Sequence, residues 1–240
     1  MRLDMYLAEN GYASTRSRAS NLIKLGAVQV NGERAGKPSF EVKCGDRVEV
    51  TDVIKYYSLG GLKLERAIER FELSIHGTAI DIGASNGGFT DCLLRHGAQK
   101  VYAVDVGESA LPKELAADSR VVIMDNVNAR TLTVGDFSEK ADYITIDVSF
   151  ISLTLILPSA IPLLKEDGVI IALIKPQFEV GRKHLTKSGV VKNAKVRDGA
   201  VSAVCSIASK LGLVKLGLVE APVLFADKNI EYLVYFKKVD

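Results

Sequence analysis

The sequence predicts a doubly wound α/β fold built on a seven-stranded, mostly parallel sheet, with a small α+β domain before it. From residue 75 onward, near-continuous apolar strands alternate with helical segments, which is typical of a parallel sheet covered by helices on both faces. The first of these strands runs into a glycine-rich turn at residues 83–88, where such sheets bind their ligands. The first fifty residues instead hold two short helical segments and short alternating strands, which predicts a separate domain.

The composition is that expected of a globular protein without a membrane span. The 240 residues are 48% hydrophobic and 25% charged, which is ordinary for a globular protein. Cys44, Cys92 and Cys205 are widely spaced and form no Cys-x-x-Cys pair, so we expect reduced thiols in a cytoplasmic protein and no metal site. The N-terminus lacks an apolar signal region, and polar residues interrupt the longest apolar stretch, 143–157, so we expect no membrane span.

The N-terminal segment has recognisable start and stop signals. An amphipathic helix is expected over residues 3–9, followed by a break at 10–11 and a second helix from about Ser14 or Thr15 to Gly26. Strand 28–30 precedes an Asn-Gly turn, and the alternation over 42–50 surrounds a Gly-Asp turn, so both are expected to be hairpins. We predict a small domain over residues 1–50, a linker over 51–58 and a second domain over 59–240.

This segment resembles the small RNA-binding module first described in ribosomal protein S4. The matching residues are Arg2-Leu3-Asp4, Leu7, Thr15 to Ala19, Leu22-Ile23, Gly26, Val28, Val30-Asn31-Gly32 and Gly45-Asp46. Cations on the second helix would meet phosphate oxygens without reading bases, although isolated charges are by default a solvated helix face. A second basic stretch, residues 175–197, holds seven Lys or Arg residues and a single acid, Glu179. The predicted RNA ligands are Arg2, Thr15, Arg16, Arg18, Lys24, Arg182 and Lys183.

The second segment provides the seven strands in order. They are expected at residues 79–83, 100–106, 121–125, 143–149, 169–175, 213–219 and 232–237, the last two forming a hairpin. Helices are expected at 88–96, 153–164 and 196–211. This pattern matches the doubly wound fold of S-adenosylmethionine-dependent methyltransferases, in which the ligand lies beyond the carboxyl ends of the strands.

The glycine turn indicates the kind of ligand. Its Gly-x-x-x-Gly-Gly spacing lacks both the dinucleotide fingerprint and the Lys-Ser/Thr ending of a phosphate loop, so a pyrophosphate is not the first choice. Asp81, inside one strand, and Asp105, at the end of the next, suit a ligand with an amino group and a ribose diol, such as S-adenosylmethionine. The predicted cofactor ligands are Asp81, Gly83, Ala84, Ser85, Gly87, Gly88, Phe89, Asp105, Val106, Asp125, Asn126 and Asp147.

Acids and amides end three successive strands, at Asp105, at 125–126 and at Asp147. A parallel sheet brings these ends to one crevice, where Asp105 would accept the ribose hydroxyls and residues 125–126 would meet the adenine edge. The alternative for each is a helix cap or turn residue.

Lys175 ends the next strand, where partial desolvation would lower its pKa towards a value useful for proton transfer and Asp147 would pair with it.

Five motifs resemble the TlyA family, whose members are often labelled hemolysins and are similar to FtsJ-type ribosomal RNA ribose methyltransferases. The motifs lie at residues 60–64, 81–91, 146–153, 174–179 and 229–231. The resemblance covers nearly the whole chain and implies methyl transfer from S-adenosylmethionine to ribose 2′-hydroxyls of ribosomal RNA, free or in ribosomal subunits. It also implies a Lys-Asp-Lys-Glu catalytic tetrad at Lys63, Asp147, Lys175 and Glu231. Spacing alone does not assign Lys63 and Glu231, which would otherwise be a surface lysine and a strand-edge acid.

The chain departs from that family pattern at two places. Leu59 stands where an arginine is usual, and residues 107–112 replace an aromatic-containing stretch. Both flank the expected entrance and crevice, so weaker cofactor binding or a shifted substrate is one expectation. Two other functions compete with the methyltransferase: a membrane-active hemolysin, and a non-catalytic RNA-binding or ribosome-assembly factor.

Overall fold

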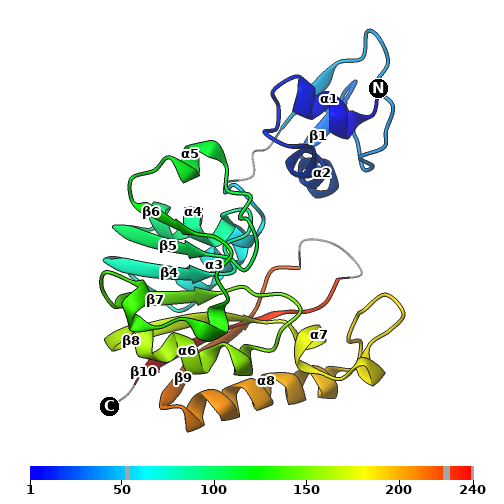
Figure 1. The fold of residues 1–240 in the computed structure, drawn as a ribbon. Coiled ribbons are helices and arrows are strands. Elements are labelled where there is room, and N and C mark those ends of the chain that lie inside the picture. The colour runs from blue at the N-terminus through cyan, green and yellow to red at the C-terminus, as the bar shows by residue number, and fades with distance from the viewer. Residues whose placement is uncertain (52–54, 224–227, 239–240) are drawn as a thin grey trace.

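The computed structural model describes residues 1–51, 55–223 and 228–238. Its N-terminal part is a small lobe that Figure 1 shows apart from the large sheet. The elements of this lobe are α1 (Leu3–Glu9), α2 (Arg16–Leu25), β1 (Val28–Val30), β2 (Glu33–Arg34) and β3 (Val48–Val50). The strands pair antiparallel in the order β2-β1-β3, and both helices pack on the sheet through buried residues such as Leu3, Leu7 and Ile23.

The second helix begins and ends where the sequence predicts. The Thr15 hydroxyl accepts a hydrogen bond from the backbone N–H of Arg18, which caps the first turn of α2. Gly26 ends the helix in the left-handed region, with φ 79°, a conformation that glycine adopts without steric cost. The hairpin after β1 is also confirmed, because Val30 pairs with Glu33 across the Asn-Gly turn.

The second predicted hairpin, over residues 42–50, is wrong. Strand β3 pairs with β1, whereas Val42 exchanges backbone hydrogen bonds with Met1: Val42 N–H donates to Met1 O at 2.8 Å and the Met1 amino group donates to Val42 O at 3.0 Å. Residues on the two sides of the Gly45 turn therefore pair with different segments. The alternation was real, but it did not identify the pairing partner.

The large body carries the remaining elements. The helices are α3 (Gly60–Arg70), α4 (Gly88–Arg95), α5 (Lys113–Ala116), α6 (Leu157–Ala160), α7 (Pro176–Glu179) and α8 (Ala194–Lys210). The strands are β4 (Thr78–Ile82), β5 (Lys100–Val104), β6 (Val121–Met124), β7 (Ala141–Ile146), β8 (Leu164–Ile174), β9 (Leu213–Glu220) and β10 (Tyr232–Lys238). Short 3₁₀ helices are η1 (Ala129–Thr131), η2 (Val134–Asp136), η3 (Leu153–Leu155), η4 (Ile161–Leu163) and η5 (Arg182–His184).

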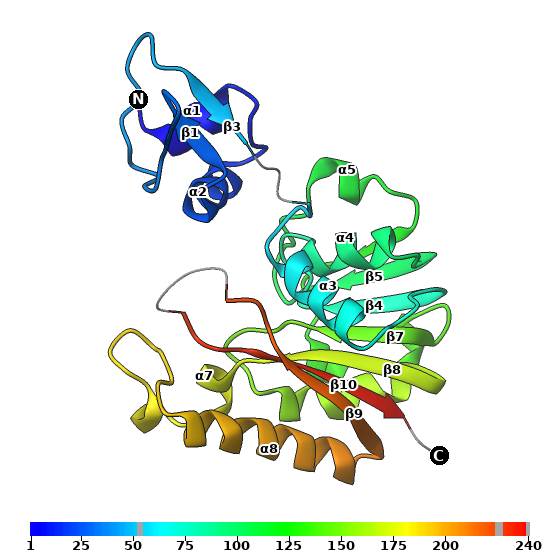
Figure 2. The same ribbon diagram turned by 180° about the vertical axis from the view of Figure 1, so that it is seen from behind.

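The seven strands form one sheet in the order β6-β5-β4-β7-β8-β10-β9. Strands β4 to β8 are parallel to one another, and β10 is antiparallel to both β8 and β9. Helices α6 and α8 cover the face seen in Figure 1, and α3 and α4 cover the face seen in Figure 2. The core is accordingly divided, with Ile144 and Val204 in the cluster on one face and Leu64 and Leu93 in that on the other. The predicted doubly wound fold is confirmed.

The helix predicted over residues 153–164 is wrong as a single element. The segment forms η3, α6 and η4 in turn, because Pro158 and Pro162 each remove an N–H donor and disfavour a continuous helix. Strand β8 then begins at Leu164, five residues before its predicted start at Val169.

Residues 55–59 connect the two bodies through specific contacts. Arg18 of α2 donates from Nη1 to the carbonyl oxygens of Tyr56 and Tyr57 at 2.8 and 2.9 Å. The Tyr56 side chain is fully buried in the core beside α3 and α4, whereas Leu59 packs against the N-terminal core. Part of the predicted linker is thus held by both bodies; the domain boundaries themselves stay a prediction.

Candidate active site

The glycine turn lies where backbone segments approach one another too closely for a side chain. Gly83 follows β4 with φ 89°, and a Cβ there would lie 2.4 Å from the backbone oxygen of Asp147. A Cβ on Gly88, the first residue of α4, would lie 2.1 Å from the Ser58 hydroxyl oxygen and 2.9 Å from the Gly61 nitrogen. Glycine at these positions lets the end of β7 and the start of α3 close around the turn.

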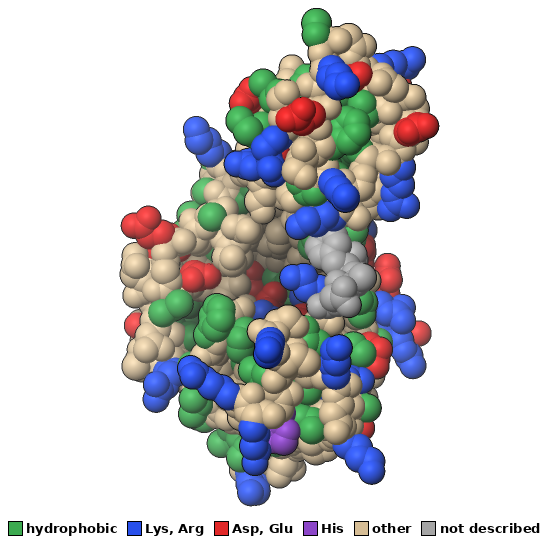
Figure 3. Space-filling view, turned by 90° about the vertical axis from the view of Figure 1, so that its right-hand side faces the viewer, with side chains coloured by type: hydrophobic (Ala, Val, Ile, Leu, Met, Phe, Trp, Pro, Cys, Tyr) green, Lys and Arg blue, Asp and Glu red, His purple; other side chains and the backbone are tan. Residues whose placement is uncertain are grey.

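Two adjoining cavities open beside this turn. The first, about 530 Å³, extends towards α3 and β10, and the second, about 480 Å³, extends over the ends of β5 and β7. They share Gly83, Ser85, Asp147 and Ser149, and each volume suits a small ligand. Figure 3 shows a hollow between the N-terminal lobe and the large body, with acidic and basic side chains in it and further Lys and Arg side chains above and below.

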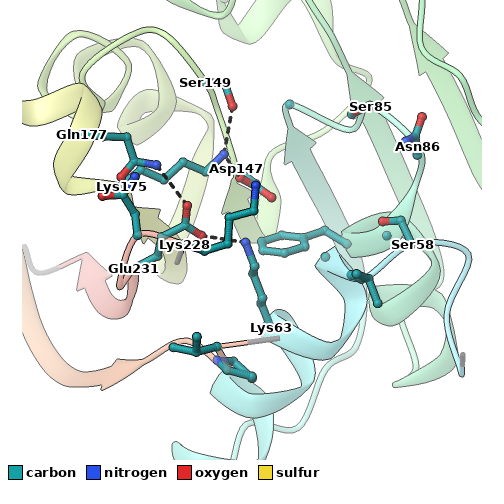
Figure 4. A pocket seen from close by; sticks show the side chains of 18 of the residues that line it. Ser58, Lys63, Ser85, Asn86, Asp147, Ser149, Lys175, Gln177, Lys228 and Glu231 are labelled. Atoms are coloured by element: carbon teal, nitrogen blue, oxygen red, sulfur yellow. Dashed lines mark hydrogen bonds and ion pairs between the residues drawn. The ribbon is translucent and has the colours of Figure 1, made fainter. Parts of the chain in front are cut away.

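The first cavity holds the four residues of the predicted tetrad as two ion pairs. Lys63, on α3, has its Nζ 2.6 Å from Oε2 of Glu231, which directly precedes β10. Lys175, which follows β8, has its Nζ 2.6 Å from Oδ1 of Asp147, which follows β7. Their side chains are 12 to 22% exposed. As Figure 4 shows, all four converge on one wall of the cavity.

Two polar neighbours fix this arrangement. Lys175 also donates to the Ser149 hydroxyl at 3.0 Å, and Gln177 donates from Nε2 to Oε1 of Glu231 at 3.2 Å (Figure 4). Glu231 is therefore held from two sides, by Lys63 and by Gln177. Both Ser149 and Gln177 stand inside recognised motifs, but polar residues near strand ends are too common for the sequence to mark them as site residues.

An exposed aromatic residue at the edge of the second cavity was missed by the sequence reading. Phe150 is 91% exposed, adopts φ 64°, and lies with its ring centroid 5.0 Å from that of Phe178. A bulky side chain with positive φ is strained, and such strain gathers at functional sites. The hydropathy pattern of the sequence does not single out Phe150, because what distinguishes this residue is its backbone conformation.

In the second cavity, Asp105 is oriented by the backbone. Its Oδ2 accepts the N–H of Ser85 at 2.9 Å and its Oδ1 accepts the N–H of Gly107 at 3.0 Å. Each carboxylate oxygen keeps a further lone pair for a donor in the cavity. A ribose diol offers two such donors, so the residues present fit the nucleoside half of S-adenosylmethionine. Val106 also lines this cavity.

The structure corrects the direct ligand role predicted for Asp81. Its side chain is fully buried and accepts hydrogen bonds from the hydroxyls of Thr90 at 2.6 Å and Thr145 at 2.8 Å. It lines neither cavity, because it points between β7 and α4. Asp81 braces the strand that carries the glycine turn. Burial raises the pKa of its carboxyl to about 6.

Replacing Asp81 by asparagine should therefore change how stability depends on pH. Because its pKa is higher in the folded than in the unfolded protein, Asp81 makes the free energy of unfolding fall as pH rises from about 4 to about 6, by about 3 kcal/mol. In urea unfolding between pH 4 and 7, the free energy of unfolding of Asp81→Asn should rise relative to that of the wild type over this interval, because only the wild type has a carboxyl group to deprotonate. If the two free energies of unfolding differed by the same amount at every pH, the raised pKa of Asp81 would be contradicted.

The adenine-edge role of Asp125 and Asn126 stays a prediction. Neither lines the second cavity, where Val127 and Asn128 are found instead. The Asp125 carboxylate accepts the N–H of Ser109 at 3.1 Å. It thus organises the loop after β5, the turn role that the sequence offered as the alternative.

The predicted RNA ligands of the N-terminal lobe divide into two groups. Arg2 and Arg16 both pair with Asp4, at 3.0 and 2.8 Å, yet keep 44% and 57% of their side chains exposed. Hydrogen bonds from Arg2, with those from Arg16, lower the pKa of the buried Asp4 carboxyl to about 2. Thr15 caps α2 and Arg18 holds residues 56–57, and their contact with RNA stays a prediction. Lys24 is exposed on α2.

The basic stretch presents its charge outward. Arg182 and Lys183 are exposed in η5. The one acid of the stretch, Glu179, instead turns inward and accepts the Leu153 N–H at 2.9 Å and a bond from the Ser152 hydroxyl; burial raises its pKa. This surface therefore carries little opposing charge.

In the described residues, no cluster of three or more His, Cys, Asp or Glu side chains is arranged to hold a metal ion. Over the same ranges, no helix combines the length and the apolar character needed to cross a membrane.

Comparison with known proteins identifies both parts of the chain. The FtsJ-like methyltransferase family matches residues 56–238 and the S4 domain matches residues 1–48. YqxC of Bacillus subtilis, provisionally named an rRNA methyltransferase, is 42% identical over 98% of this chain and 84% of its own. The 16S/23S rRNA (cytidine-2′-O)-methyltransferase TlyA of Mycobacterium tuberculosis is 37% identical over 98% and 89%. A solved Streptococcus thermophilus structure labelled a hemolysin is 39% identical over 100% and 89%, with TM-score 0.79. The chain therefore belongs to the FtsJ-like methyltransferase family and, within it, groups with the TlyA proteins.

Proposed function

We propose that this protein is an S-adenosylmethionine-dependent methyltransferase that modifies ribose 2′-hydroxyls of ribosomal RNA. One observation supports this most directly: Lys63, Asp147, Lys175 and Glu231 form two ion pairs at one cavity wall, next to the glycine turn. The relatives named TlyA act on cytidine 2′-oxygens of rRNA, and the S4 match provides an RNA-binding module. The reaction would take place in the cytoplasm, where ribosomes are assembled.

The proposed roles follow from the two cavities. The second cavity would hold the nucleoside of S-adenosylmethionine, with Asp105 on the ribose diol and Val106 beside the base. The amino-acid part would extend along the glycine turn, from Gly83 to Phe89, which lines mainly the first cavity. When bound there, the cofactor supplies an electrophilic methyl group. The first cavity would hold the target ribose. Asp147 lines both cavities and so lies where the two ligands would meet.

A ribose hydroxyl is a poor nucleophile because it is almost fully protonated near neutral pH, so its proton needs an acceptor. Once Lys175 has released its own ammonium proton to solvent, its neutral Nζ is placed to take the hydroxyl proton, since the Asp147 carboxylate and the Ser149 hydroxyl hold that nitrogen at the junction of the cavities. Lys63 and Glu231, braced by Gln177, would hydrogen-bond and orient the sugar. We thus propose Lys175 as the base, Asp147 as the residue that positions it, and Lys63 and Glu231 as the residues that orient the ribose.

RNA would be bound from both sides of the hollow. Arg2, Arg16 and Lys24 on the lobe, and Arg182 and Lys183 on the basic stretch, would contact phosphates and fix the register of the RNA. Such contacts position a folded RNA without reading its bases, so the selection of one nucleotide would come from its shape and its accessibility.

The test is transfer of a labelled methyl group from S-adenosylmethionine to ribosomal RNA, or to subunits, from cells that lack this protein. We expect incorporation at ribose, mapped by mass spectrometry as one 2′-O-methyl nucleotide that is absent from those cells. No transfer to either substrate, together with no calorimetric binding of S-adenosylmethionine, would favour the non-catalytic factor. Dye release from liposomes by the purified protein would favour the hemolysin.

A further inference from the structure

The first cavity carries one positive charge that the tetrad does not balance. Its ionisable lining residues are three lysines and two carboxylates. Before Lys175 releases its proton, Lys63 with Glu231 and Lys175 with Asp147 form neutral pairs at 2.6 Å, which leaves the charge of Lys228. Among the residues that the structure describes, no carboxylate pairs with Lys228.

Lys228 is exposed, but the chain beside it is held in place. Its neighbour Asn229 accepts the N–H of Val191 at 2.9 Å and donates to the oxygen of Gly189 at 3.0 Å. These bonds fix the chain next to Lys228 against the 189–191 segment, and Ser188 lines the same cavity. In Figure 4, the Lys228 side chain lies among those of the tetrad rather than away from them. Lys228 also stands three positions before Glu231, so both belong to one short segment.

The substrate of the proposed reaction brings a negative charge to this place. In an RNA chain, the carbon next to the one bearing the 2′-hydroxyl carries the 3′-phosphodiester, so a reacting 2′-oxygen cannot enter the cavity without that phosphate close behind it. Burying the phosphate unpaired would be costly. Of the cations in this cavity, Lys228 alone is not already neutralised by a described carboxylate.

We propose that Lys228 binds the 3′-phosphate of the target nucleotide, with the Ser188 hydroxyl as a second donor. The proposal rests on the ribose methyltransferase function and adds to it a subsite for the phosphodiester. Lys228 would make the enzyme select nucleotides inside an RNA chain over free nucleosides. Its role is in binding, because proton transfer belongs to Lys175.

The competing anion is the α-carboxylate of the methyl donor, since the first cavity also contains Gly88 and Phe89 of the glycine turn. A lysine that held this carboxylate would control cofactor affinity and would be indifferent to the phosphate. The two roles therefore predict opposite results for cofactor binding and for phosphate preference.

The decisive test is a binding titration that needs no turnover. Cytidine and cytidine 3′-monophosphate, chosen because TlyA relatives are named for cytidine, are titrated by NMR into the protein saturated with S-adenosylhomocysteine. The wild type should bind the 3′-monophosphate about ten-fold more tightly than the nucleoside. In Lys228→Ala the two should bind equally, and Lys228→Arg should restore most of the preference. Cytidine 5′-monophosphate should show no comparable gain.

The matched control is Lys140→Ala, which removes an exposed lysine just before β7, at the opposite edge of the sheet. It should keep the wild-type preference. With ribosomal RNA as substrate, Lys228→Ala should raise KM several-fold, leave kcat nearly unchanged, and reduce the salt slope of log(kcat/KM) by about one phosphate contact.

Either of two results would overturn the proposal: an unchanged 3′-phosphate preference in Lys228→Ala, or a weaker calorimetric affinity of that variant for S-adenosylmethionine. If the wild type instead binds the 3′-monophosphate in a Lys228-dependent way but methylates no ribosomal RNA, the phosphate subsite stands and the proposed function fails. The two failures are thus distinguishable.

Discussion

Replacing Lys175 by alanine should reduce methyl transfer to ribosomal RNA by about a thousand-fold, the usual loss when a positioned general base is removed. The effect should be in kcat, because Lys175 contacts Asp147 and Ser149 at the junction of the two cavities and belongs to neither the glycine turn nor the basic surface. Affinity for S-adenosylmethionine, measured by calorimetry, should change little. Transfer is measured in single-turnover assays with saturating cofactor.

The chain offers a matched control for this variant at the other end of the same two strands. Lys165, near the start of β8, pairs with Asp142 of β7 at 2.8 Å, as Lys175 after β8 pairs with Asp147 after β7. Lys165→Ala breaks a similar ion pair away from the cavities and should leave transfer close to wild type. Equal losses in both variants would mean that Lys175 acts through folding. Lys175→Arg keeps the charge but is not expected to restore transfer, because a guanidinium does not give up its proton near neutral pH.

The sheet was predictable because its strands are near-continuous apolar runs, and all seven appear within a few residues of their expected bounds. The two wrong predictions, the single helix over 153–164 and the hairpin over 42–50, concern features that the period of apolar residues does not encode. Pro158 and Pro162 break the segment expected as one helix, and Val42 pairs with Met1, far along the chain. Local pattern thus identified the elements better than their partners.

The site was predictable in part, for a similar reason. Asp147 and Lys175 follow neighbouring parallel strands, so topology alone brings them to one edge of the sheet. Lys63 and Glu231 are 168 residues apart, on a helix and before an antiparallel strand, and only the family resemblance connected them. Asp81 was misplaced because alternation does not show whether a buried acid faces a ligand or a neighbouring helix.

Substituting Gly83 by alanine should disable cofactor binding, the second large effect that the structure predicts. The residue has φ 89°, and its new Cβ would lie 2.4 Å from the backbone oxygen of Asp147. Backbone cannot give way as a flexible side chain can, so the end of β7 must shift and carry Asp147 with it. Displacement of a site residue by about 1 Å can cost about 100-fold in rate, and we expect a loss of at least that size in kcat/KM, with weaker calorimetric binding of S-adenosylmethionine.

Gly45→Ala separates the clash from the cost of the backbone conformation. Gly45 has φ 92° and nothing within 4 Å of an added Cβ, so both variants lose about 1 to 2 kcal/mol for placing alanine in the left-handed region. Only Gly83→Ala also displaces a neighbouring strand. Urea unfolding should show the larger destabilisation for Gly83→Ala, and Gly45→Ala should bind the cofactor as the wild type does. If both variants lost the same stability and Gly83→Ala kept its cofactor affinity, the close approach of Gly83 to Asp147 would not be what shapes the site.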